Sequence, residues 1–178
     1  MNFKRDNRLT FVIALAVTVA VLVAGQLLWQ KYAVARPLGS GLQGIAGVTA
    51  ANWDENKNGD ITINVTLGGV DNLAKTYGEI GETATTILGK RPARINLADS
   101  RTPELDALYH AVHFHLQEAI VTGNFSAMAD RVDAKARAAG AEARVYVDTR
   151  NVYLQLHKAG AALYAVVPRP DAVAREVK

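Results

Sequence analysis

The most prominent feature of the hydropathy pattern is a run from Leu9 to Gln30 that contains no charged side chain. As a helix rising 1.5 Å per residue, this run would be roughly 30 Å long, which is about the thickness of the hydrocarbon core of a bilayer. Trp29 and Tyr32 lie at its C-terminal end, where aromatic side chains favour the membrane interface. The pattern therefore predicts a transmembrane helix over residues 9–30.

The same segment has a second interpretation as a cleaved signal peptide. Basic residues precede the run, and Ala33-Val34-Ala35 is an A-x-A triplet, so cleavage after Ala35 stays open. The apolar part of a signal peptide is usually about 7–15 residues long, which is shorter than this run. The length therefore favours an anchor that is not cleaved.

Beyond residue 41 the pattern alternates between strand and helix periodicity. Ile61, Ile63 and Val65 alternate with polar residues, as in a half-buried strand, and Asn58-Gly59 before them is a hairpin signal. Cap residues and terminal glycines mark three helices. The expected elements are a helical turn at 42–45, strands near 48–53, 61–67, 93–97, 143–147, 152–157 and 161–167, and helices near 71–88, 102–122 and 124–139.

The order of these elements, (α)ββαβ-αα-βββ, predicts an α+β fold in which one N-terminal transmembrane helix precedes a single α+β domain with one core. The alternation of Val152, Leu154 and Leu156 predicts a sheet with one face in water. The expected division of the chain is a cytoplasmic tail over 1–8, the transmembrane helix over 9–30, a linker over 31–41, the domain over 42–168 and a flexible tail over 169–178.

Two glycines, Gly78 and Gly81, lie inside the first of the three predicted helices. Each weakens a helix by about 1 kcal/mol relative to alanine. Close packing of this helix on the sheet would account for them.

Charge adds an orientation to this picture. The chain has 20 Lys and Arg against 17 Asp and Glu, but the excess flanks the apolar run, because residues 37–178 carry 15 basic and 16 acidic side chains. A folded part with a net charge of −1 argues against nucleic-acid binding. The short, basic N-terminal tail predicts that the N-terminus is cytoplasmic and that the domain lies outside the cell membrane. The lack of cysteine excludes disulfides, thiol catalysis and a lipid-modified cysteine.

One loop resembles the start of a calcium-binding loop. Asp54, Asn56, Asn58 and Asp60 alternate as oxygen ligands do in the first half of an EF-hand loop, and Gly59 stands at its glycine position. The pattern then departs from the motif, because Val65 occupies the position of the bidentate glutamate. A polar hairpin tip is the favoured interpretation of these four candidates.

A histidine-rich helix offers a second candidate site. At helical spacing, Asp106, His110 and His113 share a face opposite the leucine stripe. A catalytic zinc site usually has three protein ligands and a water, so this face is a candidate metal or acid–base site, with His157 as a further ligand if the fold brings it near. A solvated polar helix face explains the same residues.

Four basic residues, Lys90, Arg91, Arg94 and Arg101, surround the predicted strand at 93–97. They would suit anionic headgroups or an acidic partner. A solvated edge strand that these charges protect from pairing is the favoured interpretation. The chain has no glycine-rich phosphate loop and no G-x-S-x-G motif.

The helix–strand–strand–helix–strand order of residues 42–98 resembles small ring-building domains found on anchored subunits of bacterial secretion and sporulation complexes. The resemblance is one of topology over about a third of the chain, without a diagnostic motif, and it concerns the fold rather than the function.

Together these features favour a single-pass, membrane-anchored protein whose extracytoplasmic domain is a non-enzymatic binding or assembly module. The expected partners are the lipid bilayer, through residues 9–30, and a protein or a second copy of the chain. No cofactor is expected. Two alternatives stay open: a membrane-anchored metal-dependent enzyme that uses Asp106, His110 and His113, and a sensor domain for a small extracytoplasmic ligand.

Overall fold

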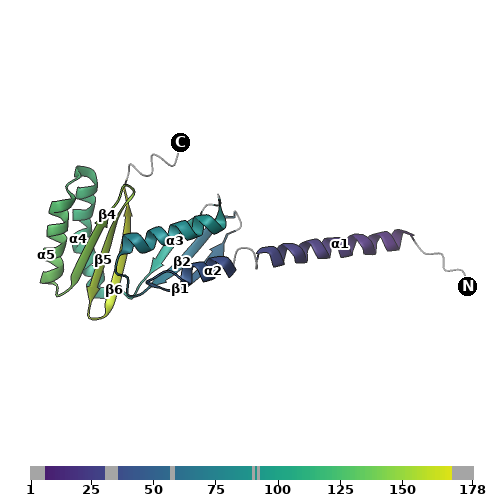
Figure 1. The fold of residues 1–178 in the computed structure, drawn as a ribbon, viewed down its shortest axis with the longest axis horizontal. Coiled ribbons are helices and arrows are strands. Elements are labelled where there is room, and N and C mark those ends of the chain that lie inside the picture. Colours follow the sequence, from purple (N-terminus) through teal and green to yellow (C-terminus); the bar gives the residue numbers. More distant parts are fainter. Residues whose placement is uncertain (1–6, 31–35, 57–58, 90, 92, 170–178) are drawn as a thin grey trace, which may run out of the picture.

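The computed structural model describes residues 7–30, 36–56, 59–89, 91 and 93–169. Its first helix, α1 (Asn7–Gln30), extends away from the rest of the molecule (Figure 1). The side chains described on α1 are those of residues 11–25, and all of them are exposed. Within the described residues, no helix is long and apolar enough to cross a membrane.

The first half of the domain is a three-stranded sheet covered by two helices. Its elements are α2 (Arg36–Gln43), β1 (Val48–Glu55), β2 (Ile61–Leu67), α3 (Leu73–Leu88) and β3 (Ala93–Ala98). Strand β2 is central, antiparallel to β1 and parallel to β3, and α3 makes the crossover between the two parallel strands. Ile61, Ile63 and Val65 are buried on one face of β2, as their alternation predicted.

The structure corrects the linker that we expected over residues 31–41. Residues 36–41 form most of α2 instead, and Leu38 on this helix is fully buried. Pro37 is tolerated in the first turn of a helix, and Leu38 and Leu42, four residues apart, face the core together. Gly41 allows α2 to approach α3 closely, since a Cβ there would lie 3.0 Å from Thr83 Cγ2.

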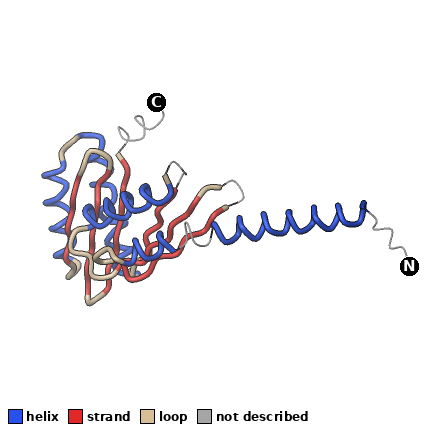
Figure 2. The backbone as a smooth tube through the Cα atoms, turned by 45° about the vertical axis from the view of Figure 1, so that its right-hand side comes forward, coloured by secondary structure: helices blue, strands red, loops and turns tan. Residues whose placement is uncertain are grey.

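The second half is an antiparallel three-stranded sheet with two helices on one face (Figures 1 and 2). Its elements are α4 (Pro103–Thr122), α5 (Phe125–Ala138), β4 (Glu142–Val147), β5 (Asn151–Lys158) and β6 (Ala161–Pro168). The side chains of Thr102 and Asn124 cap α4 and α5, as predicted. The cap of α3 is Asn72 rather than Asp71, because the Asn72 side chain accepts a hydrogen bond from the Lys75 N–H.

Two hydrophobic cores replace the single core that we expected. One face of β5 carries Val152, Leu154 and Leu156, which pack with α4 and α5. The opposite face carries Tyr153, which joins the core formed by α2, α3 and the first sheet, and Gln155, which is fully buried. The predicted wet face of this sheet is therefore wrong, because the first half of the domain covers it. The alternation did not reveal this, since tyrosine and glutamine are read as polar positions.

The tip of the β5–β6 hairpin contains a strained alanine. Ala159 and Gly160 connect the paired residues Lys158 and Ala161, and both adopt positive φ, 50° and 82°. Two positive φ angles in a two-residue hairpin loop favour Asn-Gly over Ala-Gly. Ala159 is the only non-glycine residue with positive φ in the described part of the chain.

Replacement of Ala159 by asparagine is expected to raise the free energy of unfolding by about 0.5–1 kcal/mol, because asparagine accepts the left-handed conformation at lower cost. Urea denaturation of the full chain in mild detergent would measure the change. Ala139→Asn is the matched control, since Ala139 is exposed and has φ −86°. A loss of stability in Ala159→Asn would contradict the assignment of strain to this turn.

Candidate functional site

A groove of about 770 Å³ runs between α3 and one end of the second sheet. We call it the α3 groove. One wall is α3, and the other is the β4–β5 turn with the ends of β5 and β6. It is lined by Ala74, Tyr77, Gly78, Gly81, Glu82, Thr85, Thr86, Asp148, Arg150, Asn151, Tyr153 and Pro168. Its volume lies within the range of about 300–1,000 Å³ that is usual for ligand sites.

Two tyrosines form the apolar part of the groove. The rings of Tyr77 and Tyr153 meet edge to face, with centroids 5.9 Å apart. The Tyr153 hydroxyl donates to Asp148 Oδ2 at 2.7 Å and accepts from Asn151 Nδ2 at 3.1 Å. Burial, together with the hydrogen bond to Asp148, raises the pKa of Tyr153 to about 12. Tyr153 is therefore neutral at physiological pH, and its hydroxyl holds Asp148 and Asn151 in the wall of the groove.

Asp148 holds the β4–β5 turn in place. Its Oδ1 accepts the backbone N–H groups of Arg150 and Asn151, both at 2.6 Å. Burial alone would raise the pKa of this carboxyl group, but these bonds, the Tyr153 hydroxyl and the nearby Arg150 outweigh it and lower the pKa. The Asp148 carboxylate thus accepts the backbone N–H groups that the turn would otherwise leave without a partner.

The guanidinium group of Arg150 is a charged donor that takes no part in the hydrogen bonds of the β4–β5 turn. Among the described residues, its guanidinium group has no hydrogen bond and no ion pair. Burial raises the pKa of Tyr77, and the positive charge of Arg150 opposes that rise. Arg150 and Tyr77 line the same groove, and a guanidinium group suits a carboxylate or another anion.

Gly78 and Gly81 line the groove rather than packing on the sheet, which corrects our expectation for them. A Cβ added at either position would meet no atom within 4 Å. Neither has a positive φ. Each therefore costs about 1 kcal/mol of helix stability relative to alanine without any packing or backbone requirement in this chain.

The histidine-rich face of α4 is only partly assembled. His110 and His113 stack at 5.2 Å, and His113 Nδ1 lies 2.8 Å from the backbone carbonyl of His110. Asp106, however, accepts a hydrogen bond from Arg101 at 3.3 Å. His157 lies on β5 against the ring of Tyr164. Among the described residues, no group of three or more His, Asp and Glu side chains is arranged to hold a metal ion.

The calcium-like loop forms the tip of the β1–β2 hairpin. Asn56 accepts from the Asp60 N–H at 2.9 Å and donates to Asp60 Oδ2 at 2.8 Å, while Asp54 Oδ2 accepts from Asn64 at 3.2 Å. Asn58 lies outside the described residues. Asp54, Asn56 and Asp60 are thus engaged in hydrogen bonds within the hairpin.

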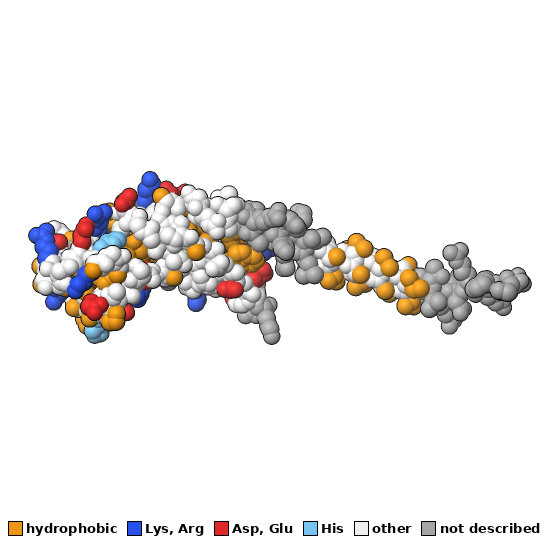
Figure 3. Space-filling view, turned by 90° about the horizontal axis from the view of Figure 1, so that it is seen from below, with side chains coloured by type: hydrophobic (Ala, Val, Ile, Leu, Met, Phe, Trp, Pro, Cys, Tyr) orange, Lys and Arg blue, Asp and Glu red, His pale blue; other side chains and the backbone are white. Residues whose placement is uncertain are grey.

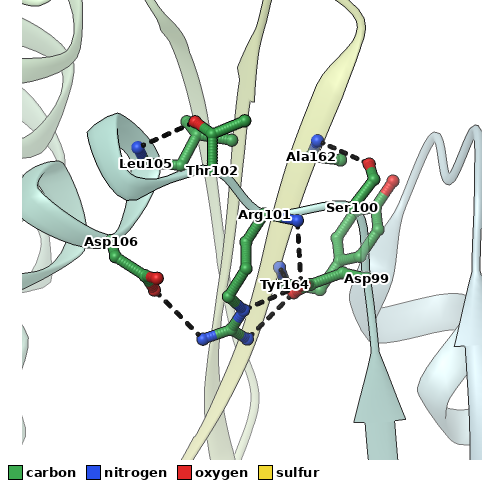
Figure 4. Close-up of polar contacts among 8 residues, drawn as sticks. All are labelled: Asp99, Ser100, Arg101, Thr102, Leu105, Asp106, Ala162 and Tyr164. Carbon is green, nitrogen blue, oxygen red and sulfur yellow. Dashed lines mark hydrogen bonds and ion pairs between the residues drawn. The ribbon is translucent and has the colours of Figure 1, made fainter.

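The basic residues around β3 separate into two kinds. Arg91 and Arg94 are exposed, and Lys90 lies outside the described residues. Arg101 instead turns toward the junction of the two sheets, where it binds Asp99 at 2.8 Å and Asp106 at 3.3 Å (Figure 4). It therefore has a structural role.

Sequence reasoning did not identify Tyr77, Asp148 or Arg150. These residues lie up to 73 positions apart, and each is an ordinary surface residue in its own segment. The available signal was the pair of glycines inside α3, Gly78 and Gly81. We explained them by packing on the sheet, whereas they line the groove.

The chain matches no protein-family model, and no curated protein or solved structure shows significant similarity to it.

Proposed function

We propose that this protein is a single-pass, membrane-anchored binding or assembly module with its α+β domain on the outer side of the cell membrane. The observation that carries the proposal is the surface of α1. The side chains of residues 11–25 are all exposed, and the large apolar ones among them, including Phe11, Leu15 and Leu22, are each more than half exposed (Figure 3).

Apolar surface of this extent is costly in water. Burying a single large aliphatic or aromatic side chain is worth about 1.5–3 kcal/mol, and α1 presents nine of them among its described residues. The uncharged run from Leu9 to Gln30 supports the bilayer as the medium that covers them. Lys4, Arg5 and Arg8 precede the run, and these basic residues support a cytoplasmic position for that flank.

The domain would then work close to the membrane. Only residues 31–35 separate α1 from α2, and five extended residues span at most about 18 Å. Such a short connection suits assembly with another protein at the membrane better than reach into bulk solvent.

Binding, rather than catalysis, is supported by the α3 groove. It combines a guanidinium group, a tyrosine hydroxyl and an aromatic floor, which are groups that recognise a ligand.

The test is chemical crosslinking in intact membranes. We expect the full chain to stay in the membrane pellet after an alkaline wash and to form adducts larger than the monomer. Val17→Asp places a charge near the centre of α1, which costs about 2.5–3.5 kcal/mol of insertion free energy, so this variant should lose both properties. Val17→Leu is the matched control.

Two outcomes would refute the proposal. One is release of the unmodified chain by the wash, which would show that α1 does not anchor the protein in the membrane. The other is recovery of the domain only as an uncrosslinked monomer, which would show that it does not assemble with another protein. Protease digestion of the domain in unlysed cells would establish on which side of the membrane it lies.

A further inference from the structure

We propose that the α3 groove binds an extended peptide segment of a partner protein and that a single carboxylate of this segment pairs with Arg150. This inference rests on the proposed binding function and names the surface and the chemistry that would carry it.

The length of the groove fits a short extended chain. Its α3 wall reaches from Ala74 to Thr86, which is about 18 Å along a helix that rises 1.5 Å per residue. An extended strand covers this length in about five residues. Gly78, Glu82, Thr85 and Thr86 are exposed or open to solvent along this wall, so a segment can lie along it without being enclosed.

The two glycines leave the backbone of α3 uncovered where such a segment would lie. At two other glycines the neighbours explain the small residue, because a Cβ would lie 3.0 Å from Thr83 at Gly41 and 2.9 Å from Thr49 at Gly68. At Gly78 and Gly81 the space that a Cβ would occupy is empty within the chain. Close approach of another backbone accounts for small residues at these two positions.

The polar groups of the groove select one negative charge. The hydroxyl groups of Thr85 and Thr86 already donate to carbonyls of their own helix, at 2.8 Å each. Arg150 is therefore the principal charged donor, and Tyr77 lines the same groove. Glu82 and Asp148 line the same groove, and both carboxylates repel further negative charge, so a segment with one acidic residue fits better than a polyacidic one.

The experiment uses the full chain in lipid nanodiscs and fluorescence anisotropy. The probes are two libraries of fluorescein-labelled pentapeptides that differ only in the central residue, aspartate in one and asparagine in the other. We expect dissociation constants below 1 mM for members of the aspartate library and at least tenfold weaker binding for their asparagine counterparts. Arg150→Gln should remove this difference.

The double substitution Gly78→Ala and Gly81→Ala separates binding from folding. It should raise the thermal midpoint by about 3 °C for each residue, because alanine favours the helix, and it should weaken the best aspartate peptide at least tenfold. Gly39→Ala in α2 is the matched control, since a Cβ there also meets nothing within 4 Å but lies outside the groove. It should not change peptide binding.

Three results would overturn the inference: no binding by either library, equal binding of aspartate and asparagine peptides, or full binding by the double alanine variant. Failure of the proposed function is distinguishable. If the double variant still forms crosslinked adducts in membranes at the wild-type level, the groove is not the docking surface although the protein is an assembly module. If the wild-type chain forms no adducts, the proposed function itself fails.

Discussion

Replacement of Gln155 by alanine is expected to lower the free energy of unfolding by about 4 kcal/mol. Gln155 is fully buried, and its amide closes the start of α3: Oε1 accepts the Leu73 N–H at 2.9 Å, and Nε2 donates to the Val70 carbonyl at 2.8 Å. Alanine would leave both backbone groups buried without a partner, at about 1–3 kcal/mol each, and would also leave a cavity. A loss of this size is a large fraction of the stability of a typical domain.

Two further variants separate these contributions. Gln155→Met keeps most of the volume and removes both hydrogen bonds, so it should lose nearly as much stability as alanine if the hydrogen bonds dominate. Gln117→Ala on the exposed face of α4 is the control and should change stability by less than about 0.5 kcal/mol. Urea denaturation followed by circular dichroism would measure all three. A loss below 1 kcal/mol in Gln155→Ala would contradict the role of this side chain.

Replacement of Asp99 by alanine is expected to lower the free energy of unfolding by about 3 kcal/mol. The Asp99 side chain is 1% exposed and lies where β3 leads toward α4, against the free edge of β6 (Figure 4). It accepts the Tyr164 N–H at 2.8 Å and the Arg101 guanidinium at 2.8 and 3.0 Å. Without it, a partly buried strand N–H loses its partner, and Arg101 keeps only its ion pair with Asp106.

The neighbouring residues supply graded controls for Asp99. Ser100 Oγ accepts the Ala162 N–H at 3.0 Å, so Ser100→Ala should lose about 1 kcal/mol. Asp106→Asn should lose less than about 1 kcal/mol, because the ion pair of Asp106 with Arg101 is solvent-exposed. Faster hydrogen exchange at the Tyr164 amide in Asp99→Ala would locate the effect. Equal losses in Asp99→Ala and Asp106→Asn would show that the carboxylate at position 99 does not cap β6.

The elements that the sequence predicted well are those whose signals are local. Thr102 and Asn124 cap their helices through bonds to residues three positions away, and Gly123 ends α4 with φ 75°. The strand at 61–67 was predicted with its observed bounds. The error at α2 has a local cause as well, because Pro37, Gly39 and Gly41 read as a link, whereas the burial of Leu38 and Leu42 stabilises a helix.

The candidate site was largely beyond prediction. The face shared by Asp106, His110 and His113 follows from helical periodicity, but Arg101 engages Asp106 through a loop whose path periodicity does not describe. The α3 groove joins residues of α3 to the β4–β5 turn. Nothing in either segment alone indicates that they lie side by side.

By itself, the sequence determined the order of the secondary structure in the domain, the charge asymmetry about an uncharged N-terminal run and the absence of thiol chemistry. These follow from periodicity and caps, which involve residues only a few positions apart, and from composition, which does not depend on position. Only the tertiary structure decided that there are two cores, that β5 is buried on both faces and that a groove opens beside Gly78 and Gly81. The deciding contacts, such as those of Gln155 with Leu73 and Val70, join residues more than 80 positions apart, and burial at that range depends on how whole elements pack.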